Sequence, residues 1–312
     1  MNDPQTRWLI GGIVILLAIA TAIGRILKTR AESDGAQKVI ANLNARINAW
    51  WVMCAVFAAA LIVGPIGTVV LFACMSFFAL REFITITPSK RGDHRSLFWS
   101  FFILLPLQYV FVARQWYGMF SIFIPVYAFL LIPIRNAIAG DTEPFLERTA
   151  KIQWGLMVAV YFVSYAPALL TLHIPGYAGQ NAKLLFFFAC VVQGSDVLQY
   201  VFGKLFGKRP IAAKVSPNKT LEGFLGGILA ASLVGTALWW ATPFSPVAAF
   251  GMALAITLMG FFGGLTMSAI KRDRGVKDYG ELVPGHGGMM DRIDSLCFAA
   301  PIFFHLTRYF YT

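Results

Sequence analysis

The sequence predicts an all-α protein, a polytopic bundle of about ten transmembrane helices with both termini outside. Three observations support this prediction. The chain of 312 residues is 58% hydrophobic and only 13% charged, with a mean hydropathy of +0.67, which is typical of a multi-spanning membrane protein. Apolar runs of about twenty residues recur along the chain. Basic residues gather in every second loop between these runs.

Ten apolar runs are close to the length that a helix needs to cross a bilayer. They cover residues 8–27, 48–64, 65–82, 97–113, 117–134, 153–172, 183–203, 224–242, 246–270 and 293–311. Only Gly64-Pro65-Ile66-Gly67 joins the second run to the third. These two runs therefore form a helical hairpin or one broken helix, and the broken helix would reduce the count to nine.

The first run also resembles a signal peptide, because Ala18-Ile19-Ala20 is similar to a cleavage site. Asp3 and Arg7 precede it without a basic excess, which favours an uncleaved first helix. The segment after it, residues 28–47, predicts either an amphipathic helix on the membrane surface or a solvated linker.

The Lys and Arg residues predict the orientation of the chain. Of the 26 basic residues, all but Arg7, Arg114, Lys183 and Arg308 lie in or beside the loops that follow the odd-numbered runs. The positive-inside rule places these loops in the cytoplasm. The same alternation tests the number of helices, because removing one run would put the loop at 81–96 on the wrong side.

Composition also limits the partners. The net charge of +11, gathered in loops, favours anionic lipid head groups or phosphates. No basic and aromatic module typical of nucleic-acid binding is present, so we expect no nucleic acid. The four cysteines lie in apolar runs without a C-x-x-C pair, and so predict neither disulfides nor zinc. The Gly223–Gly227 and Gly260–Gly264 pairs predict close helix packing.

Residues 268–294 form a polar stretch between the last two apolar runs, with five acids, five basic residues, five glycines and a histidine. Asp291 and Asp294 are spaced i, i+3, so both lie on one helical face if the last helix begins near Met290. Two carboxylates near Lys277 favour a Mg²⁺ site completed by substrate phosphates. The alternative is an acidic pair that only stabilises a helix N-terminus.

His286 lies within Pro284-Gly285-His286-Gly287-Gly288, just before the predicted helix. Glycines there let the backbone approach an anion with its N–H groups, and a helix N-terminus also attracts phosphate. His286 then donates a hydrogen bond to a phosphate or to leaving pyrophosphate. The alternative is a histidine with a structural role only.

A second polar loop reads Ser216-Pro217-Asn218-Lys219-Thr220-Leu221-Glu222-Gly223. Its hydroxyls, N–H groups and lysine suit a phosphate, although a simple positive-inside loop is the alternative. The Gly203 to Lys208 segment before it lacks the spacing of a Walker A motif. Asp196 lies inside an apolar run, where a carboxylate is either functional or paired with a cation such as Lys204 or Arg209.

The stretch from Ser268 to Asp294 resembles the signature of the phosphatidate cytidylyltransferases, also called CDP-diacylglycerol synthases. The matching residues are Ser268, Lys271, Arg272, Lys277, Asp278, Pro284, His286, Gly287, Gly288, Asp291, Arg292 and Asp294. Upstream, Asp196, Tyr200, Gly203-Lys204, Phe206-Gly207-Lys208, Ser216-Pro217, Lys219-Thr220 and Glu222-Gly223 also resemble the family, with departures at Ser195 and Asn218. The resemblance covers about residues 185–312.

The resemblance implies that the enzyme joins CTP to phosphatidic acid, releasing pyrophosphate and leaving CDP-diacylglycerol in the membrane. It implies a divalent metal, usually Mg²⁺, with another divalent ion or a second cation as an alternative. The implied catalytic residues are Asp278, His286, Asp291, Asp294 and Lys277, and the implied metal ligands are Asp278, Asp291, Asp294 and Asp196. The implied substrate-binding residues are Asp196, Ser216, Asn218, Lys219, Thr220, Glu222, Ser268, Lys271, Arg272, Gly287, Gly288 and Arg292.

We therefore expect two regions in a multi-pass protein of the cytoplasmic membrane. Residues 1–180 supply helices for lipid access, and residues 181–312 form a catalytic region with cytoplasmic loops at 204–223 and 271–292. CTP, phosphatidic acid and membrane lipids are the expected partners, and a homodimer is compatible with the sequence. Two alternatives stay open: a related lipid-phosphate enzyme, such as an ether-lipid cytidylyltransferase or a polyprenol kinase, and a carrier for anionic lipids.

Overall fold

The structure, a computed structural model, describes residues 4–30, 33–87, 89–140, 143–282 and 287–312. Its helices in chain order are α1 (Pro4–Arg30), α2 (Asp34–Val63), α3 (Pro65–Thr85), α4 (His94–Trp99), α5 (Leu105–Ala113), α6 (Tyr117–Ile122), α7 (Phe129–Ile138), α8 (Phe145–Leu156), α9 (Phe162–Ala168), α10 (Asn181–Phe206), α11 (Leu221–Ala237), α12 (Pro246–Asp273) and α13 (Met290–Tyr311). Short 3₁₀ or π segments are η1 (Arg91–Asp93), η2 (Ser100–Leu104), η3 (Phe123–Ala128), η4 (Met157–Tyr161), η5 (Leu169–Thr171) and η6 (Trp239–Ala241).

The prediction of a helical protein with several membrane-length helices is confirmed. Eight helical segments in the described residues are long and apolar enough to cross a membrane. Nine of the ten predicted apolar runs fall in helices within a residue or two at their ends. The remaining run, 224–242, covers most of α11 and continues through the 3₁₀ segment η6. Two of these helices lie outside the eight: α11 has only 17 residues, and α13 begins with the charged residues Asp291, Arg292 and Asp294. The number of membrane crossings therefore remains a prediction.

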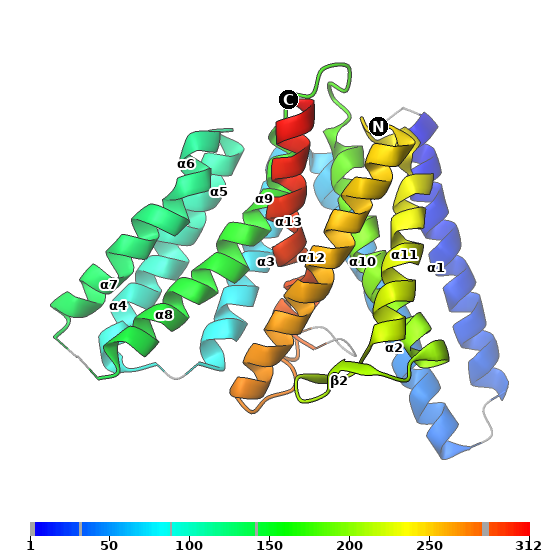
Figure 1. Ribbon diagram of the computed structural model, residues 1–312, viewed down its shortest axis with the longest axis horizontal. Helices are drawn as coiled ribbons and strands as arrows, with labels where there is room; N and C mark the ends of the chain where they lie inside the picture. Colours follow the sequence, from blue (N-terminus) through cyan, green and yellow to red (C-terminus); the bar gives the residue numbers. More distant parts are fainter. Residues whose placement is uncertain (1–3, 31–32, 88, 141–142, 283–286) are drawn as a thin grey trace.

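The helices are arranged so that the polar loops lie together. Figure 1 shows the start of α1 and the end of α13 at one end of the bundle, and the loops at 207–220 and 274–282 at the other. The chain reverses direction at Gly64, whose φ of +98° lies in the region that favours glycine. Pro65 then opens α3, a position where its missing N–H is not needed. This arrangement corresponds to the hairpin alternative for the second and third runs.

Two local predictions were wrong. Residues 34–47 form neither a separate surface helix nor a linker, because they belong to the 30-residue helix α2. The structure also contains two short antiparallel strands, β1 (Pro210–Ala212) and β2 (Ser216–Thr220), where the all-α prediction had only a loop. Thr220 ends β2 and caps α11, because its hydroxyl accepts the N–H of Gly223 at 3.2 Å.

Glycines allow close contact among the four C-terminal helices. A Cβ at Gly223 or Gly227 would come within 2.8 Å or 2.5 Å of the backbone of Gln199 in α10. A Cβ at Gly263 of α12 would lie 2.8 Å from the Asp294 carbonyl oxygen in α13. The first G-x-x-x-G pair therefore packs against α10, as predicted, and α12 and α13 are held at backbone distance beside the polar loops.

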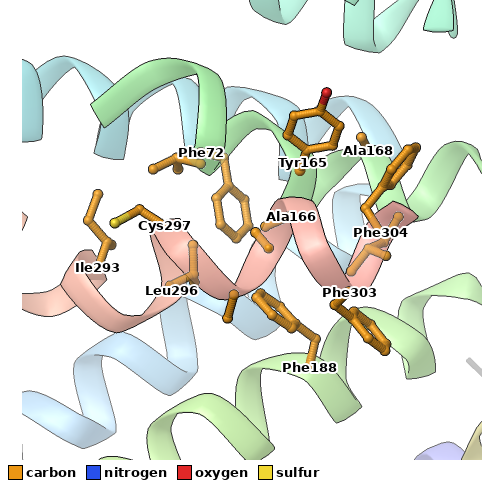
Figure 2. Close-up of a cluster of buried hydrophobic side chains, with 14 of the residues drawn as sticks. Phe72, Tyr165, Ala166, Ala168, Phe188, Ile293, Leu296, Cys297, Phe303 and Phe304 are labelled. Carbon is orange, nitrogen blue, oxygen red and sulfur yellow. The ribbon is translucent and has the colours of Figure 1, made fainter. Parts of the chain in front are cut away.

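Aromatic rings within the buried core pack around α13 (Figure 2). The rings of Phe188 in α10 and Phe303 in α13 stack with centroids 5.4 Å apart. On another side of α13, Phe304 contacts Tyr165 of α9 with centroids 5.1 Å apart. Phe72 of α3 belongs to the same cluster. Because offset and edge-to-face ring pairs favour particular positions, this cluster fixes α13 relative to helices from both halves of the chain.

A buried ion pair stabilises the N-terminal half. The Arg148 guanidinium of α8 binds the carboxylate of Asp93 through two nitrogens, with an Nη2–Oδ1 distance of 2.7 Å. Both side chains are buried. Bidentate pairs of this kind are geometrically specific, so the contact holds the start of α4 against α8.

Candidate active site

A cavity of about 1160 Å³ lies between α2, α10, α11, α12, the start of α13 and the two polar loops. Twelve of the sequence-predicted site residues line it, namely Asp196, Ser216, Asn218, Lys219, Thr220, Ser268, Lys277, Asp278, Gly287, Asp291, Arg292 and Asp294. The second polar loop and the signature stretch, which 44 residues of chain separate, thus meet around one space.

Asp196 and Asp294 are held together by one serine. The Ser295 hydroxyl donates to Asp196 Oδ1 at 3.0 Å and lies 3.4 Å from Asp294 Oδ1. The sequence left open an ion pair between Asp196 and Lys204 or Arg209. In the structure, Lys204 lies over the Tyr200 ring and Arg209 pairs with Glu222, so neither pairs with Asp196. Among the described residues, no lysine or arginine nitrogen lies within 4.0 Å of either carboxylate. Two carboxylates so close together without a direct counter-charge are typical of a cation site.

Lys219 extends from β2 into the same space. Its ammonium lies 4.9 Å from the centre of the Phe261 ring. A Cβ at Gly264 would lie 2.9 Å from Lys219 Nζ and 3.9 Å from Asp294 Oδ2, so both groups cover that glycine. Burial lowers the pKa of the Lys219 ammonium, while the charges of Asp294 and Asp196 act in the opposite direction.

Asp291 has a different environment from Asp294. Its Oδ1 accepts the Lys271 ammonium at 2.7 Å. Its Oδ2 accepts the N–H groups of Tyr279 at 2.8 Å and Gly288 at 3.0 Å. Since an ionised carboxylate offers about four lone pairs, Asp291 retains room for about one further donor or cation. Through these contacts, the Asp291 side chain holds the signature stretch against α12 and α13. Asp291 also borders the cavity.

Arg292 supplies an unsatisfied donor at the cavity. Its Nε atom is buried and has no hydrogen-bond partner among the described residues. Its carbonyl oxygen accepts the Gln193 amide of α10 at 3.3 Å, which fixes its backbone. A buried guanidinium nitrogen without a partner is costly, and a phosphate oxygen in the cavity would satisfy it.

The remaining predicted residues divide into three groups. Lys277 and Asp278 are exposed and line the cavity. His286, with Pro284 and Gly285, lies outside the described residues. Lys271, Arg272, Glu222 and Gly288 do not line the cavity.

Each residue of the third group instead makes a contact that supports the wall of the cavity. Lys271 pairs with Asp291, and Gly288 donates its N–H to the same side chain. Arg272 donates to the carbonyl oxygens of Val215 at 3.3 Å and Val276 at 2.9 Å, joining the two loops. Glu222 accepts the N–H groups of Lys208 and Arg209. Each of these four residues, expected to bind substrate directly, therefore has a structural contact beside the cavity.

Sequence reasoning missed the contribution of the N-terminal half. Asn42, Arg46 and Trp50 of α2 line the cavity, and Glu82 of α3 accepts hydrogen bonds from the start of α13. The apolar and polar alternation of residues 28–47 was a signal for the α2 residues. No local signal distinguishes Glu82, which follows Arg81 at the end of an apolar run.

The residues present fit a small hard cation. Within the described part of the chain, no group of three or more His, Cys, Asp or Glu side chains is arranged to hold a metal. Asp196 and Asp294 form a two-carboxylate set bound to one hydroxyl. Mg²⁺ is commonly held by one or two carboxylates and completed by substrate phosphates and water, so this donor set suits Mg²⁺ that arrives with a nucleotide.

Fold and site together define a polytopic membrane protein with a cavity lined by carboxylate and basic side chains at one end of its helices. Comparison with known families agrees. The model of the cytidylyltransferase family matches residues 44–310, and the chain belongs to this family. The match includes most of the N-terminal half, which the sequence motifs alone did not connect to the family.

Three relatives illustrate the similarity. The uncharacterized protein YnbB of Escherichia coli K12 is 39% identical over 300 residues, which is 94% of this chain and 95% of that protein. A phosphatidate cytidylyltransferase of Bacillus subtilis is 32% identical over 263 residues, covering 82% of this chain and 94% of the relative. A phosphatidate cytidylyltransferase of Mycobacterium leprae is 40% identical over 168 residues, or 52% of this chain and 51% of the relative.

Proposed function

We propose that this protein transfers the cytidylyl group of CTP to phosphatidic acid, giving CDP-diacylglycerol and pyrophosphate. The observation that carries the proposal is the cavity in which Asp196 and Asp294 gather with Lys219 and Arg292. Two carboxylates with two cations suit a nucleotide phosphate bound with Mg²⁺. Membership of the cytidylyltransferase family and the name of the Bacillus subtilis relative support the same reaction.

The reaction depends on positioning and charge more than on proton transfer. A phosphate oxygen of phosphatidic acid attacks the α-phosphorus of CTP and forms a new P–O bond. The bond from that phosphorus to the bridging oxygen breaks, and its electron pair leaves with pyrophosphate. Because the nucleophile is already an anion, no strong general base is needed. Lys219 and Arg292 bind phosphate oxygens and balance the charge that accumulates between the two substrates.

Asp196 and Asp294 are the proposed ligands of Mg²⁺, with Asp278 near the open side of the cavity as a further candidate. When bound, Mg²⁺ supplies charge neutralisation at the triphosphate. Asp291 holds the signature stretch in place and would have about one lone pair left for a cation. Lys277 and His286 remain candidates for contacts with the triphosphate.

Apolar residues on one side of the cavity support lateral entry of the lipid. Val197 and Tyr200 are exposed on α10 and line the cavity together with Trp50 of α2. A lipid that enters between α2 and α10 keeps its acyl chains against exposed apolar surface while its phosphate reaches Arg292 and Lys219. A water-soluble nucleotide reaches the same space from the side of the polar loops.

The direct test is an assay with the purified full-length protein in detergent. We expect labelled CTP, Mg²⁺ and phosphatidic acid to give CDP-lipid and pyrophosphate in equal amounts. A parallel reaction with an ether-lipid acceptor tests the related cytidylyltransferase reaction. If folded protein forms no CDP-lipid from either acceptor, the proposal is wrong. Phosphorylation of a polyprenol or transport without chemistry would instead support the kinase or carrier alternatives, which family membership does not favour.

Orientation in the membrane is tested by thiol labelling. We propose that the polar loops are cytoplasmic and both termini external. In a variant whose four cysteines are replaced by alanine, single cysteines are placed at Asp273, the last residue of α12, and at His173, just after η5. Both side chains are exposed, and Figure 1 shows the end of α12 and the loop that leads from α9 to α10 at opposite ends of the bundle. A membrane-impermeant maleimide should label His173→Cys in intact cells and Asp273→Cys only after permeabilisation. The reverse pattern would invert the proposed topology. Light scattering of the purified protein tests whether it forms the homodimer that the sequence permits.

A further inference from the structure

Glu82 lies in the last turns of α3, in the half of the chain outside the signature, yet its carboxylate caps α13. Its Oε1 accepts the N–H of Met289 at 2.9 Å, and its Oε2 accepts the N–H of Met290 at 2.8 Å. The first N–H groups of a helix have no partner within the helix. Met289, the N-cap of α13, makes no side-chain capping bond. Glu82 therefore supplies the cap that a local Ser, Thr or Asp normally provides.

The signature stretch is shaped to receive this carboxylate. A Cβ at Gly280 would lie 2.8 Å from Glu82 Oε1, and a Cβ at Gly288 would overlap Oε2. Beside it, the rings of Phe83 and Tyr279 stack with centroids 6.2 Å apart. Tyr279 in turn donates its backbone N–H to Asp291 and its hydroxyl to the Met267 carbonyl oxygen. The contact thus joins α3 to the loop, to α12 and to α13 at one point.

The charge of Glu82 is met by helix N–H groups rather than by a cation. In the described part of the chain, no lysine or arginine nitrogen lies within 4.0 Å of its carboxylate. A negative charge at a helix N-terminus is stabilised by the helix dipole. The same helix turn carries Arg292 and Asp294 into the cavity, so a displacement of Met290 displaces both of them.

We propose that Glu82 is a positioning residue that sets the start of α13, and with it Asp294 and Arg292, relative to Asp196 and Lys219. The proposal rests on the proposed function for its catalytic consequence, but not for the contact itself. A carboxylate with two acceptor oxygens satisfies both N–H groups, whereas a glutamine amide satisfies one and presents NH₂ donors to the other. The charge and the second hydrogen bond are lost together, while the size of the side chain is kept.

The test compares Glu82→Gln with Glu147→Gln, an exposed glutamate of α8 that pairs only with Lys151 among the described residues. Glu82→Gln should lower kcat about 10–100-fold, the range found when a contact that orients a metal site is lost. It should also raise the Mg²⁺ concentration needed for half-maximal rate, because the turn that carries Asp294 shifts. KM for phosphatidic acid should change little. Glu147→Gln should change none of these. Glu82→Asp, which keeps the charge, should recover part of the loss.

A second measurement does not depend on activity. Hydrogen–deuterium exchange of peptides covering 287–296 should be faster in Glu82→Gln than in the wild type, with peptides from α1 unchanged. Gly280→Ala, whose methyl group would intrude on Glu82 Oε1, should raise exchange in the same peptides. The double variant of Glu82→Gln and Gly280→Ala should exchange no faster than the faster single variant, because both changes break the same contact. Unchanged exchange, or a fall in kcat without a change in Mg²⁺ dependence, would overturn the proposal. If the wild type forms no CDP-lipid while exchange responds, the proposed function fails and the capping contact stands.

Discussion

Replacing Asp294 with asparagine is expected to lower the rate of CDP-lipid formation about 10³-fold or more, since it removes one of two carboxylates proposed to hold Mg²⁺ against the triphosphate. Asparagine is nearly the same size and still offers an oxygen to the Ser295 N–H, which Asp294 now accepts at 2.8 Å. The fold should therefore persist. The measurement is the initial rate with labelled CTP over a range of Mg²⁺ concentrations, together with thermal unfolding in detergent.

Two comparisons make the Asp294 result specific. Asp273→Asn changes an exposed aspartate paired with Arg274 and should leave the rate near that of the wild type. Asp291→Asn should lower both the rate and the unfolding temperature, because an amide cannot accept from Lys271, Tyr279 and Gly288 as the carboxylate does. Asp294→Asn should unfold at or above the wild-type temperature, since it removes one of two neighbouring negative charges. Retained activity in Asp294→Asn would remove this residue from the metal role.

Replacing Lys219 with methionine is expected to lower kcat about 10²–10³-fold, the usual effect of removing one donor to a developing anion. Methionine keeps the apolar stem against Phe261 but removes the charge beside Asp294. The effect should appear in kcat for both substrates, because the ammonium acts on the phosphate groups as they react. Steady-state kinetics with CTP and phosphatidic acid varied separately provide the measurement.

Lys214→Met is the matched control for Lys219. Lys214 lies in the turn between β1 and β2, is exposed and does not line the cavity, so its loss should change the rate little. Gly264→Ala should give an intermediate loss, because its methyl group would come 2.9 Å from Lys219 Nζ and force the flexible end of that side chain aside. Equal rates for Lys219→Met and Lys214→Met would show that the Lys219 charge is not used.

Hydropathy predicted the helices well because it is a local property. Each apolar run needs only its own residues to identify it, and nine of the ten fall in helices within a residue or two at their ends. The strand pair β1–β2 was missed because Ser216-Pro217-Asn218-Lys219-Thr220 has no apolar alternation. The continuation of α2 back to Asp34 was missed because charged and polar residues interrupt the hydropathy signal before the backbone leaves the helix.

For the site, sequence reasoning identified the residues better than their roles. The i, i+3 spacing correctly placed Asp291 and Asp294 at the start of a helix beginning at Met290, with both at one cavity. The spacing gave no reason to assign different roles to Asp291 and Asp294. The Lys271 and Gly288 contacts that occupy Asp291 depend on how the loop folds back, which the spacing does not show. Glu82 was missed for a similar reason: its partners lie 207 and 208 residues away, and no local pattern records such a contact.

The position of α13 limits how the chain can be recombined with its relatives. Its first turn is capped by α3, and its second half is enclosed by rings from α9 and α10. A chimera joined near residue 180 would take Glu82 and Tyr165 from one parent and Gly280, Gly288 and Phe304 from the other. A half of the sequence is therefore not an exchangeable unit. Matched positions on α3, α9, α13 and the loop before α13 must come from the same parent.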